Sequence, residues 1–130
     1  MSAPTHKQYR ILLVEDNADA ANIMSLLLEM KGHETRVTWN GQEALRMMED
    51  LYPEVVIVDI QLPLMNGYEL ACHIRKLDLE EQPLLIAVTG YGTEKDIQDA
   101  SDAGFDLHFV KPVHIDEILR AIEQYVEDAQ

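Results

Sequence analysis

The sequence predicts a doubly wound α/β fold, in which a five-stranded parallel sheet carries helices on both faces. Five short apolar segments recur along the 130 residues, and between them apolar residues step by three and four. Such regular alternation of strand and helix favours a parallel sheet covered on both sides. One such unit accounts for the whole sequence, which contains no linker, repeat or low-complexity tract, so we expect a single domain.

The strand segments differ in pattern. Four of them are continuously apolar, which is typical of strands buried on both faces, whereas the second alternates polar with apolar residues and is expected at an edge. In chain order the expected strands are Ile11–Val14, Thr35–Trp39, Val55–Val58, Leu84–Val88 and Leu107–Val110.

The helices are predicted from apolar faces and from residues that start or stop them. The first helix should bury Ala20, Ile23, Met24, Leu27 and Leu28, and the last should bury Ile115, Ile118, Leu119, Ile122 and Val126. Asn17 is placed to cap the first helix, and Asn66 with Glu69 resembles a capping box. Gly32 and Gly104 lie where helices should end.

Composition excludes several classes of function. The chain has 10 basic and 24 acidic residues and a formal net charge of −14, which disfavours direct binding to nucleic acid or to an anionic membrane surface. A single cysteine rules out an internal disulfide, and the five histidines lack the spacing of a metal site. No segment has the length and apolarity of a membrane span or secretory signal, so a cytoplasmic location is expected.

Polar residues that can take part in catalysis or metal binding follow the predicted strands. Glu15 and Asp16 come directly after the first, Asp59 after the third, Thr89 ends the fourth, and Lys111 follows the fifth. The carboxyl ends of parallel strands meet at one edge, where doubly wound sheets bind their ligands. Any one of these acids alone is more often a helix cap, but the three together with the lysine favour a functional site.

Three carboxylates close together repel one another unless a cation lies between them. A hard divalent ion such as Mg²⁺ prefers oxygen ligands and commonly uses one or two carboxylates with water and phosphate oxygens. In such a site a carboxylate can attack a phosphoryl group, while the metal and an ammonium group neutralise the transferring oxygens.

Four separated stretches of these residues resemble the receiver domains of two-component response regulators. They are ILLVEDN at 11–17, VDIQLPLMNG at 58–67, VT at 88–89 and AGFDLHFVKP at 103–112. The resemblance extends from about Tyr9 to Tyr125, and it implies a flavodoxin-like strand order of 2-1-3-4-5. We expect a polar tail over residues 1–8 and the receiver domain over residues 9–127.

The resemblance also implies a metal site. It assigns Asp59 as phosphoacceptor and metal ligand, Asp16 as a direct ligand, and the backbone carbonyl of Gln61 as a third. Glu15 stands where aspartate is more frequent and is expected to act through a water molecule. The implied ion is Mg²⁺, with Mn²⁺ as an alternative.

Three further roles follow from the same resemblance. Thr89 matches the switch hydroxyl that binds a phosphoryl oxygen, and Lys111 matches the lysine that pairs with the phosphoryl group. His108 stands at the switch position, where tyrosine or phenylalanine is common. A cis peptide bond between Lys111 and Pro112 is also implied.

As a receiver, the protein would take its phosphoryl group from a sensor histidine kinase or a histidine phosphotransfer protein. It would then signal to a downstream protein through the fourth helix, fifth strand and fifth helix, and it would not be a turnover enzyme. The resemblance leaves open whether the domain is a free-standing regulator or part of a hybrid kinase.

Three other functions fit the sequence less well. A phosphatase with an aspartyl-phosphate intermediate usually has a second acid two residues after the nucleophile, where this chain has Gln61. A dinucleotide-binding domain is disfavoured because no G-x-G-x-x-G follows the first strand. A degenerate receiver used only for protein contact would be expected to lack Asp59 or Lys111, and both are present.

Overall fold

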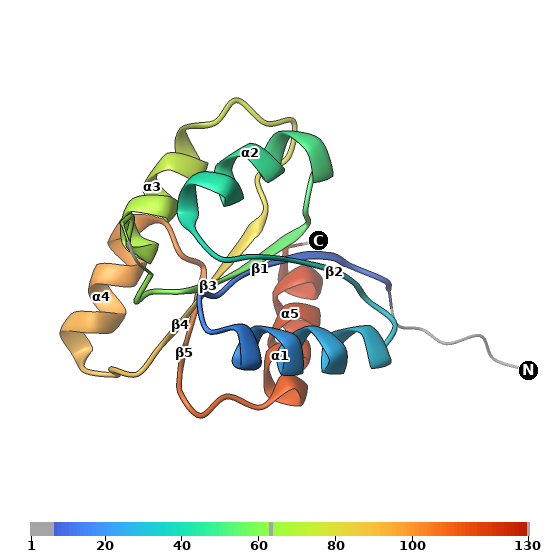
Figure 1. The fold of residues 1–130 in the computed structure, drawn as a ribbon. Helices are drawn as coiled ribbons and strands as arrows, with labels where there is room; N and C mark the ends of the chain where they lie inside the picture. The colour runs from blue at the N-terminus through green and yellow to red at the C-terminus, as the bar shows by residue number, and fades with distance from the viewer. Residues whose placement is uncertain (1–6, 63, 130) are drawn as a thin grey trace, which may run out of the picture.

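The computed structural model describes residues 7–62 and 64–129, within which five strands alternate with five helices (Figure 1). The strands are β1 (Arg10–Val14), β2 (Glu34–Thr38), β3 (Val55–Asp59), β4 (Leu84–Thr89) and β5 (Leu107–Val110). The helices are α1 (Ala18–Met30), α2 (Gly41–Leu51), α3 (Gly67–Lys76), α4 (Glu94–Ala103) and α5 (Ile115–Asp128).

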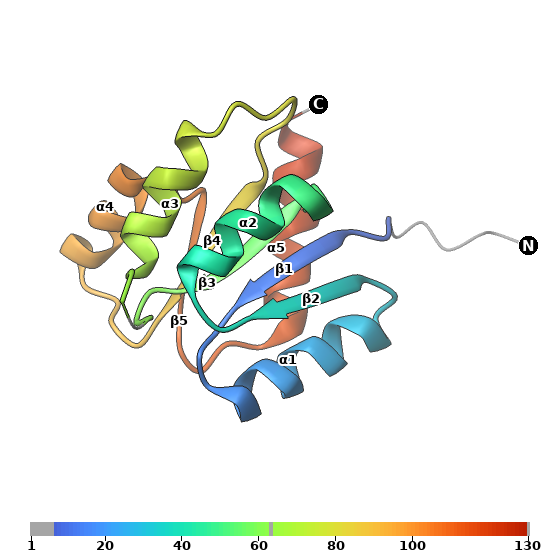
Figure 2. The same ribbon diagram turned by 45° about the horizontal axis from the view of Figure 1, so that its top comes forward.

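The strands form one parallel sheet in the order β2-β1-β3-β4-β5, which confirms the predicted fold class and order (Figure 2). Strand β1 pairs with β3 so that Val14 lies opposite Val58, and β3 pairs with β4 so that Asp59 lies opposite Val88. The carboxyl ends of the central strands are therefore level with one another. The residues that follow them meet at one edge of the sheet.

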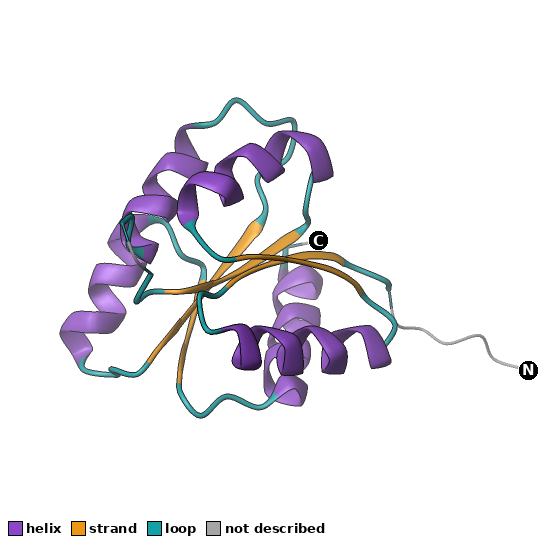
Figure 3. Ribbon diagram, viewed as in Figure 1, coloured by secondary structure: helices purple, strands orange, loops and turns teal. Residues whose placement is uncertain are grey.

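Helices lie on both faces of the sheet (Figure 3). Because side chains alternate along the central strands, the core is divided into two layers. On one face, Leu12, Val56 and Leu85 belong to the core that α2, α3 and α4 cover. On the other, Leu13 and Ile57 belong to the core beneath α1 and α5. The sheet is thus buried on both sides, as the continuous apolar segments predicted.

Local signals at the helix ends are confirmed. The Asn17 side chain accepts the backbone N–H of Ala20 at 3.0 Å, and Asn66 with Glu69 forms a reciprocal capping box on α3. Gly104 ends α4 with φ of 114°, a left-handed conformation that favours glycine. The sequence did not predict the capping box of Thr93 and Asp96 on α4.

Two strand expectations need correction. Strand β2 ends at Thr38 rather than Trp39, and the Trp39 side chain lies beyond it with 45% of its surface exposed. Strand β5, which its continuous apolar sequence predicted to be buried on both faces, is only partly buried, and Val110 is 43% exposed. As the predicted strand order implies, β5 lies at an edge of the sheet, where it pairs with β4.

The predicted core face of α1 is also partly wrong. Leu28 is buried and Met24 packs partly against the core. Three other residues predicted to be buried are exposed: Ile23 at 62%, Leu27 at 40%, and Ala20. The helix is apolar over more than one face, and only the stripe through Ala21 and Leu28 is fully buried against the sheet. The apolar periodicity predicted the helix correctly but not which side of it faces the core.

Candidate functional site

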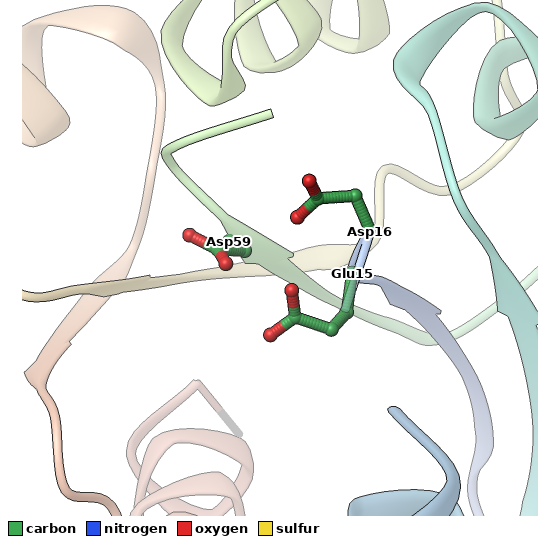
Figure 4. Close-up of side chains that lie close together, drawn as sticks. All are labelled: Glu15, Asp16 and Asp59. Carbon is green, nitrogen blue, oxygen red and sulfur yellow. The ribbon is translucent and has the colours of Figure 1, made fainter. Parts of the chain in front are cut away.

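Three acidic residues meet at the carboxyl edge of the sheet, as the sequence predicted. Glu15 and Asp16 follow β1, Asp59 ends the neighbouring β3, and one carboxylate oxygen from each lies within 4.8 Å of the others (Figure 4). Glu15 and Asp59 are buried, whereas Asp16 is exposed. Because β1 and β3 pair in parallel register, the cluster is a direct result of the sheet topology.

Each carboxylate oxygen of Asp59 has a donor. The Lys111 Nζ lies 3.0 Å from Oδ2, and the backbone N–H of Gln61 donates to Oδ1 at 2.9 Å. The side chain is buried, with only 5% of the residue surface exposed. These two contacts fix the orientation of the carboxylate at the end of β3.

Glu15 is almost as deeply buried, at 8% exposed, but it is less well partnered. Its Oε2 accepts the backbone N–H of Asn17 at 3.1 Å, and its Oε1 lies 3.9 Å from the Lys111 Nζ, beyond hydrogen-bonding distance. Burial, together with the nearby Asp59, raises the pKa of Glu15 from 4.5 to about 7. The metal-free site therefore disfavours a second ionised carboxylate.

Lys111 is held over the acids by the backbone. Its N–H donates to the Thr89 carbonyl at 2.8 Å, and the cis peptide bond to Pro112 that the family resemblance implied is present. Partial burial acts to lower the pKa of Lys111, but the hydrogen bond to Asp59 and the charges of the neighbouring acids raise it above its ordinary value. The ammonium group is therefore charged at neutral pH.

Thr89 ends β4 and is 2% exposed. Its Oγ1 accepts the backbone N–H of Tyr91 at 3.1 Å, which leaves the hydroxyl hydrogen able to donate elsewhere. The exposed side chains of Gln61 and Tyr91 lie on the loops that follow β3 and β4. The structure thus places both loops beside the acidic edge.

His108 lies within β5, opposite Ala87, rather than at the strand end with the acids. Its Nε2 is buried and has no hydrogen-bond partner in the described part of the chain. Burial lowers the pKa of His108, while the charge of Asp96 on α4 acts in the opposite direction. Burial thus favours the neutral form of the imidazole where β5 meets α4.

Sequence reasoning did not recognise the packing role of Gly67. Its backbone N–H donates to the Ile60 carbonyl at 2.9 Å, and a Cβ atom there would lie 2.7 Å from the Ile60 Cα. Only glycine permits this close approach of α3 to the residue that follows Asp59. A glycine next to the capping residue Asn66 was the available signal.

The donor set fits a hard divalent cation. Three carboxylates, with one oxygen of each within 4.8 Å of the others, supply oxygen ligands. A cation among them would offset the burial and the nearby charge of Asp59 that raise the pKa of Glu15. The geometry joins this donor set to a buried carboxylate, an ammonium group and a hydroxyl. That combination suits phosphoryl transfer to Asp59.

Comparison with known families agrees with this geometry. The family model of the response regulator receiver domain matches residues 11–123, which is most of the chain. The chain belongs to this family. It is therefore a receiver domain of the two-component type, a phosphorylation-activated signalling switch, and the phosphatase alternative is not favoured.

Curated relatives and solved structures support the assignment. The chain is 31% identical to sporulation initiation phosphotransferase F of Bacillus subtilis, covering 90% of this chain and 93% of the relative. It is 30% identical to the polar-differentiation response regulator DivK of Brucella anthropi, covering 92% and 97%. The CheY-like receiver domain protein of Methanospirillum hungatei superposes with a TM-score of 0.83 at 29% identity, covering 94% and 96%.

No helix among residues 7–62 and 64–129 has the length and apolarity needed to cross a membrane.

Proposed function

We propose that Asp59 accepts a phosphoryl group from a phosphohistidine, with Mg²⁺ held by the acidic cluster. The observation that carries the proposal is the buried Asp59 carboxylate, with Lys111 Nζ 3.0 Å from one oxygen and two further carboxylates within 4.8 Å. Asp16, Asp59 and the Gln61 carbonyl would hold the ion directly, and Glu15 would hold it through water. Mn²⁺ has the same preference for oxygen ligands and is an alternative ion.

The reaction is a displacement at phosphorus. A carboxylate oxygen of Asp59 attacks, the bond between phosphorus and the donor imidazole nitrogen breaks, and the products are an aspartyl phosphate and a neutral imidazole after protonation. When bound, the metal ion supplies positive charge to the transferring phosphoryl oxygens. The contact of Gln61 N–H with Asp59 Oδ1 orients the nucleophile before the donor arrives.

Lys111 and Thr89 would bind the product. In the unphosphorylated protein the Lys111 ammonium contacts Asp59 Oδ2, and a phosphoryl group attached there presents new oxygens to the same ammonium. The Thr89 hydroxyl, whose oxygen accepts from Tyr91, still has a hydrogen to donate to a phosphoryl oxygen. Movement of Thr89 would pass to β5 through the Lys111 N–H bond to the Thr89 carbonyl, and His108 would respond as the switch residue.

The domain, over residues 9–127 with a polar tail over 1–8, would therefore act as a signalling module rather than a turnover enzyme. Its donor would be a sensor histidine kinase or a histidine phosphotransfer protein in the cytoplasm. A downstream protein would recognise the α4–β5–α5 face, with no direct contact to nucleic acid or membrane. Family membership and the exposed apolar residues Ile97 and Val110 on this face support this proposal.

Labelling with a small phosphodonor tests the proposal. With acetyl phosphate and Mg²⁺, the parent protein should form one acid-stable, base-labile adduct, and Asp59→Asn should form none. The control is Asp50→Asn, which removes an exposed carboxylate at the end of α2 and should label like the parent. Undiminished labelling of Asp59→Asn would show that another residue is the acceptor.

A further inference from the structure

The side chain of His108 has a buried nitrogen atom without a hydrogen-bond partner. The residue is only partly buried as a whole, but its Nε2 is enclosed, and no described residue donates to it or accepts from it. The neutral imidazole can keep its proton on Nδ1, whereas the charged form must carry one on Nε2 as well. Protonation in this position would therefore bury both a positive charge and an unpaired N–H, which is unfavourable.

The elements packed around His108 offer one anionic group. On β4, the residues that share its face of the sheet are Ala87, which lies opposite it, and Thr89, and both are uncharged. On α4, the carboxylate whose charge acts on the imidazole is that of Asp96. On α3, Tyr68 interacts with the same carboxylate, and because burial and the acids of α4 raise the pKa of Tyr68, its phenol stays neutral. A protonated His108 would therefore be drawn toward Asp96.

Asp96 already holds the start of α4. Its Oδ2 accepts the backbone N–H of Thr93 at 3.1 Å and the Thr93 hydroxyl at 2.7 Å, and its own N–H donates to the Thr93 Oγ1 at 3.1 Å. These contacts form the capping box that fixes the first turn of the helix. A charge-assisted hydrogen bond from an imidazolium to this carboxylate would compete with the cap.

The loop that leads into α4 lies against the same strand. A Cβ atom at Gly92 would lie 2.6 Å from the Val110 Cγ2, so the loop backbone is in close contact with β5 two residues beyond His108. The same loop is tied to the end of β4, because the Tyr91 N–H donates to the Thr89 Oγ1 at 3.1 Å. A change at the start of α4 would therefore alter contacts with both β5 and β4.

We propose that His108 is a proton-sensitive switch, in which protonation turns the imidazole out of its place between β5 and α4 toward Asp96 and loosens the first turn of α4. Because burial lowers the pKa of His108, the packed position holds the neutral imidazole, and the outward position is populated as pH falls through a folded value below 6.5. The switch operates in the unphosphorylated protein and does not depend on phosphoryl transfer. It makes the α4–β5–α5 face respond to pH through a local charge event.

An NMR titration of the metal-free protein from about pH 8 to about pH 5 tests the proposal. The imidazole C–H shift of His108 and the backbone amide shifts of Glu94 to Ile97 should follow one curve with a midpoint below pH 6.5, and the amide curve should be lost in His108→Phe. Glu15, whose pKa is about 7, titrates in the same range, so Glu15→Gln is the control and should keep the amide curve. Amides that do not follow His108, or that titrate equally in His108→Phe, would overturn the proposal.

Two variants of α4 test the direction of the movement. Asp96→Asn keeps an oxygen that can accept from Thr93 but removes the charge, so the His108 midpoint should shift to lower pH and the amide response of the first turn should disappear. Asp102→Asn removes an exposed carboxylate from the same helix and should leave both unchanged. An unchanged midpoint in Asp96→Asn, or equal effects of the two variants, would show that His108 does not turn toward Asp96.

Discussion

Replacing Glu15 by glutamine should stabilise the metal-free protein at alkaline pH, although it removes a residue of the functional site. The carboxyl is buried at 8% exposure, close to Asp59 and 3.9 Å from the nearest ammonium. Its ionisation is therefore opposed by burial and by a like charge, and the pKa rises to about 7. Glutamine keeps the shape of the side chain and the acceptor for the Asn17 N–H, but carries no charge.

The magnitude follows from linkage between ionisation and folding. The pKa of Glu15 is 4.5 in ordinary surroundings and about 7 in the fold. With about 1.4 kcal/mol per pH unit, ionised Glu15 costs about 3 kcal/mol of folding free energy above the folded pKa. Because the folded pKa is the higher one, this cost is absent below pH 4.5 and grows as pH rises to about 7.

Urea unfolding measured by circular dichroism at about pH 5 and about pH 8, in the presence of a chelator, tests this reasoning. The unfolding free energy of Glu15→Gln should exceed that of the parent by up to about 3 kcal/mol at the higher pH and by much less at the lower pH. Glu29→Gln, which changes an exposed carboxylate on α1, is the matched control and should differ little from the parent at either pH.

If Glu15→Gln raised the unfolding free energy equally at both pH values, the charge on Glu15 would not be the cause of the stabilisation. A loss of stability at pH 8 would mean that the contact between Glu15 and Lys111 outweighs the burial and repulsion, contrary to the 3.9 Å separation.

Three other outcomes are expected. Millimolar Mg²⁺ should raise the melting temperature of the parent in a concentration-dependent way, because the ion binds the folded acidic cluster, and Asp59→Asn should weaken that dependence in a thermal melt. Arg75→Met should lower the unfolding free energy measured in urea by about 2 to 3 kcal/mol, because Arg75 donates to Asp106 at 2.8 Å and to the Gly104 carbonyl at 2.9 Å. Arg120→Met, which changes an exposed arginine, should lower it little. Burial lowers the pKa of His108, so the stability that the neutral imidazole contributes is present above the ordinary pKa of 6.5 and is lost as pH falls through the folded value. The unfolding free energy of His108→Tyr should therefore decline less steeply below pH 6.5 than that of the parent protein. Identical pH profiles for the two proteins would show that His108 is not the cause of the decline.

Much of this fold is local in origin and was therefore predictable. Continuous apolar segments such as Val55–Val58 have few alternatives to a buried strand, and the caps at Asn17 and Asn66 act within one helical turn. The acidic site was predictable for a related reason, because parallel strands must bring their carboxyl ends to a common edge. Glu15 and Asp59 come together once β1 and β3 are neighbours in the sheet.

Features that depend on distances between elements were not predictable. The sequence shows that α1 is apolar, but the exposure of Ile23 and Leu27 depends on how the helix lies on the sheet. The raised pKa of Glu15 depends on its burial and on the closeness of Asp59, which result from the packing of the elements around the sheet edge. A hollow of about 470 Å³ beside the acids, lined in part by Ala20 and Pro112, likewise arises from the spacing between α1 and the segment after β5, which no sequence pattern records.

Locating the modified residue shows whether Asp59 carries the phosphoryl group. After phosphorylation with Mg²⁺ present, reduction with borohydride converts an aspartyl phosphate to homoserine, which peptide mass spectrometry can assign to one position. We expect homoserine at position 59 in the parent protein and at no position in Asp59→Asn. Homoserine at position 16, or a stable phosphoryl group on a histidine in place of the aspartyl adduct, would contradict the account.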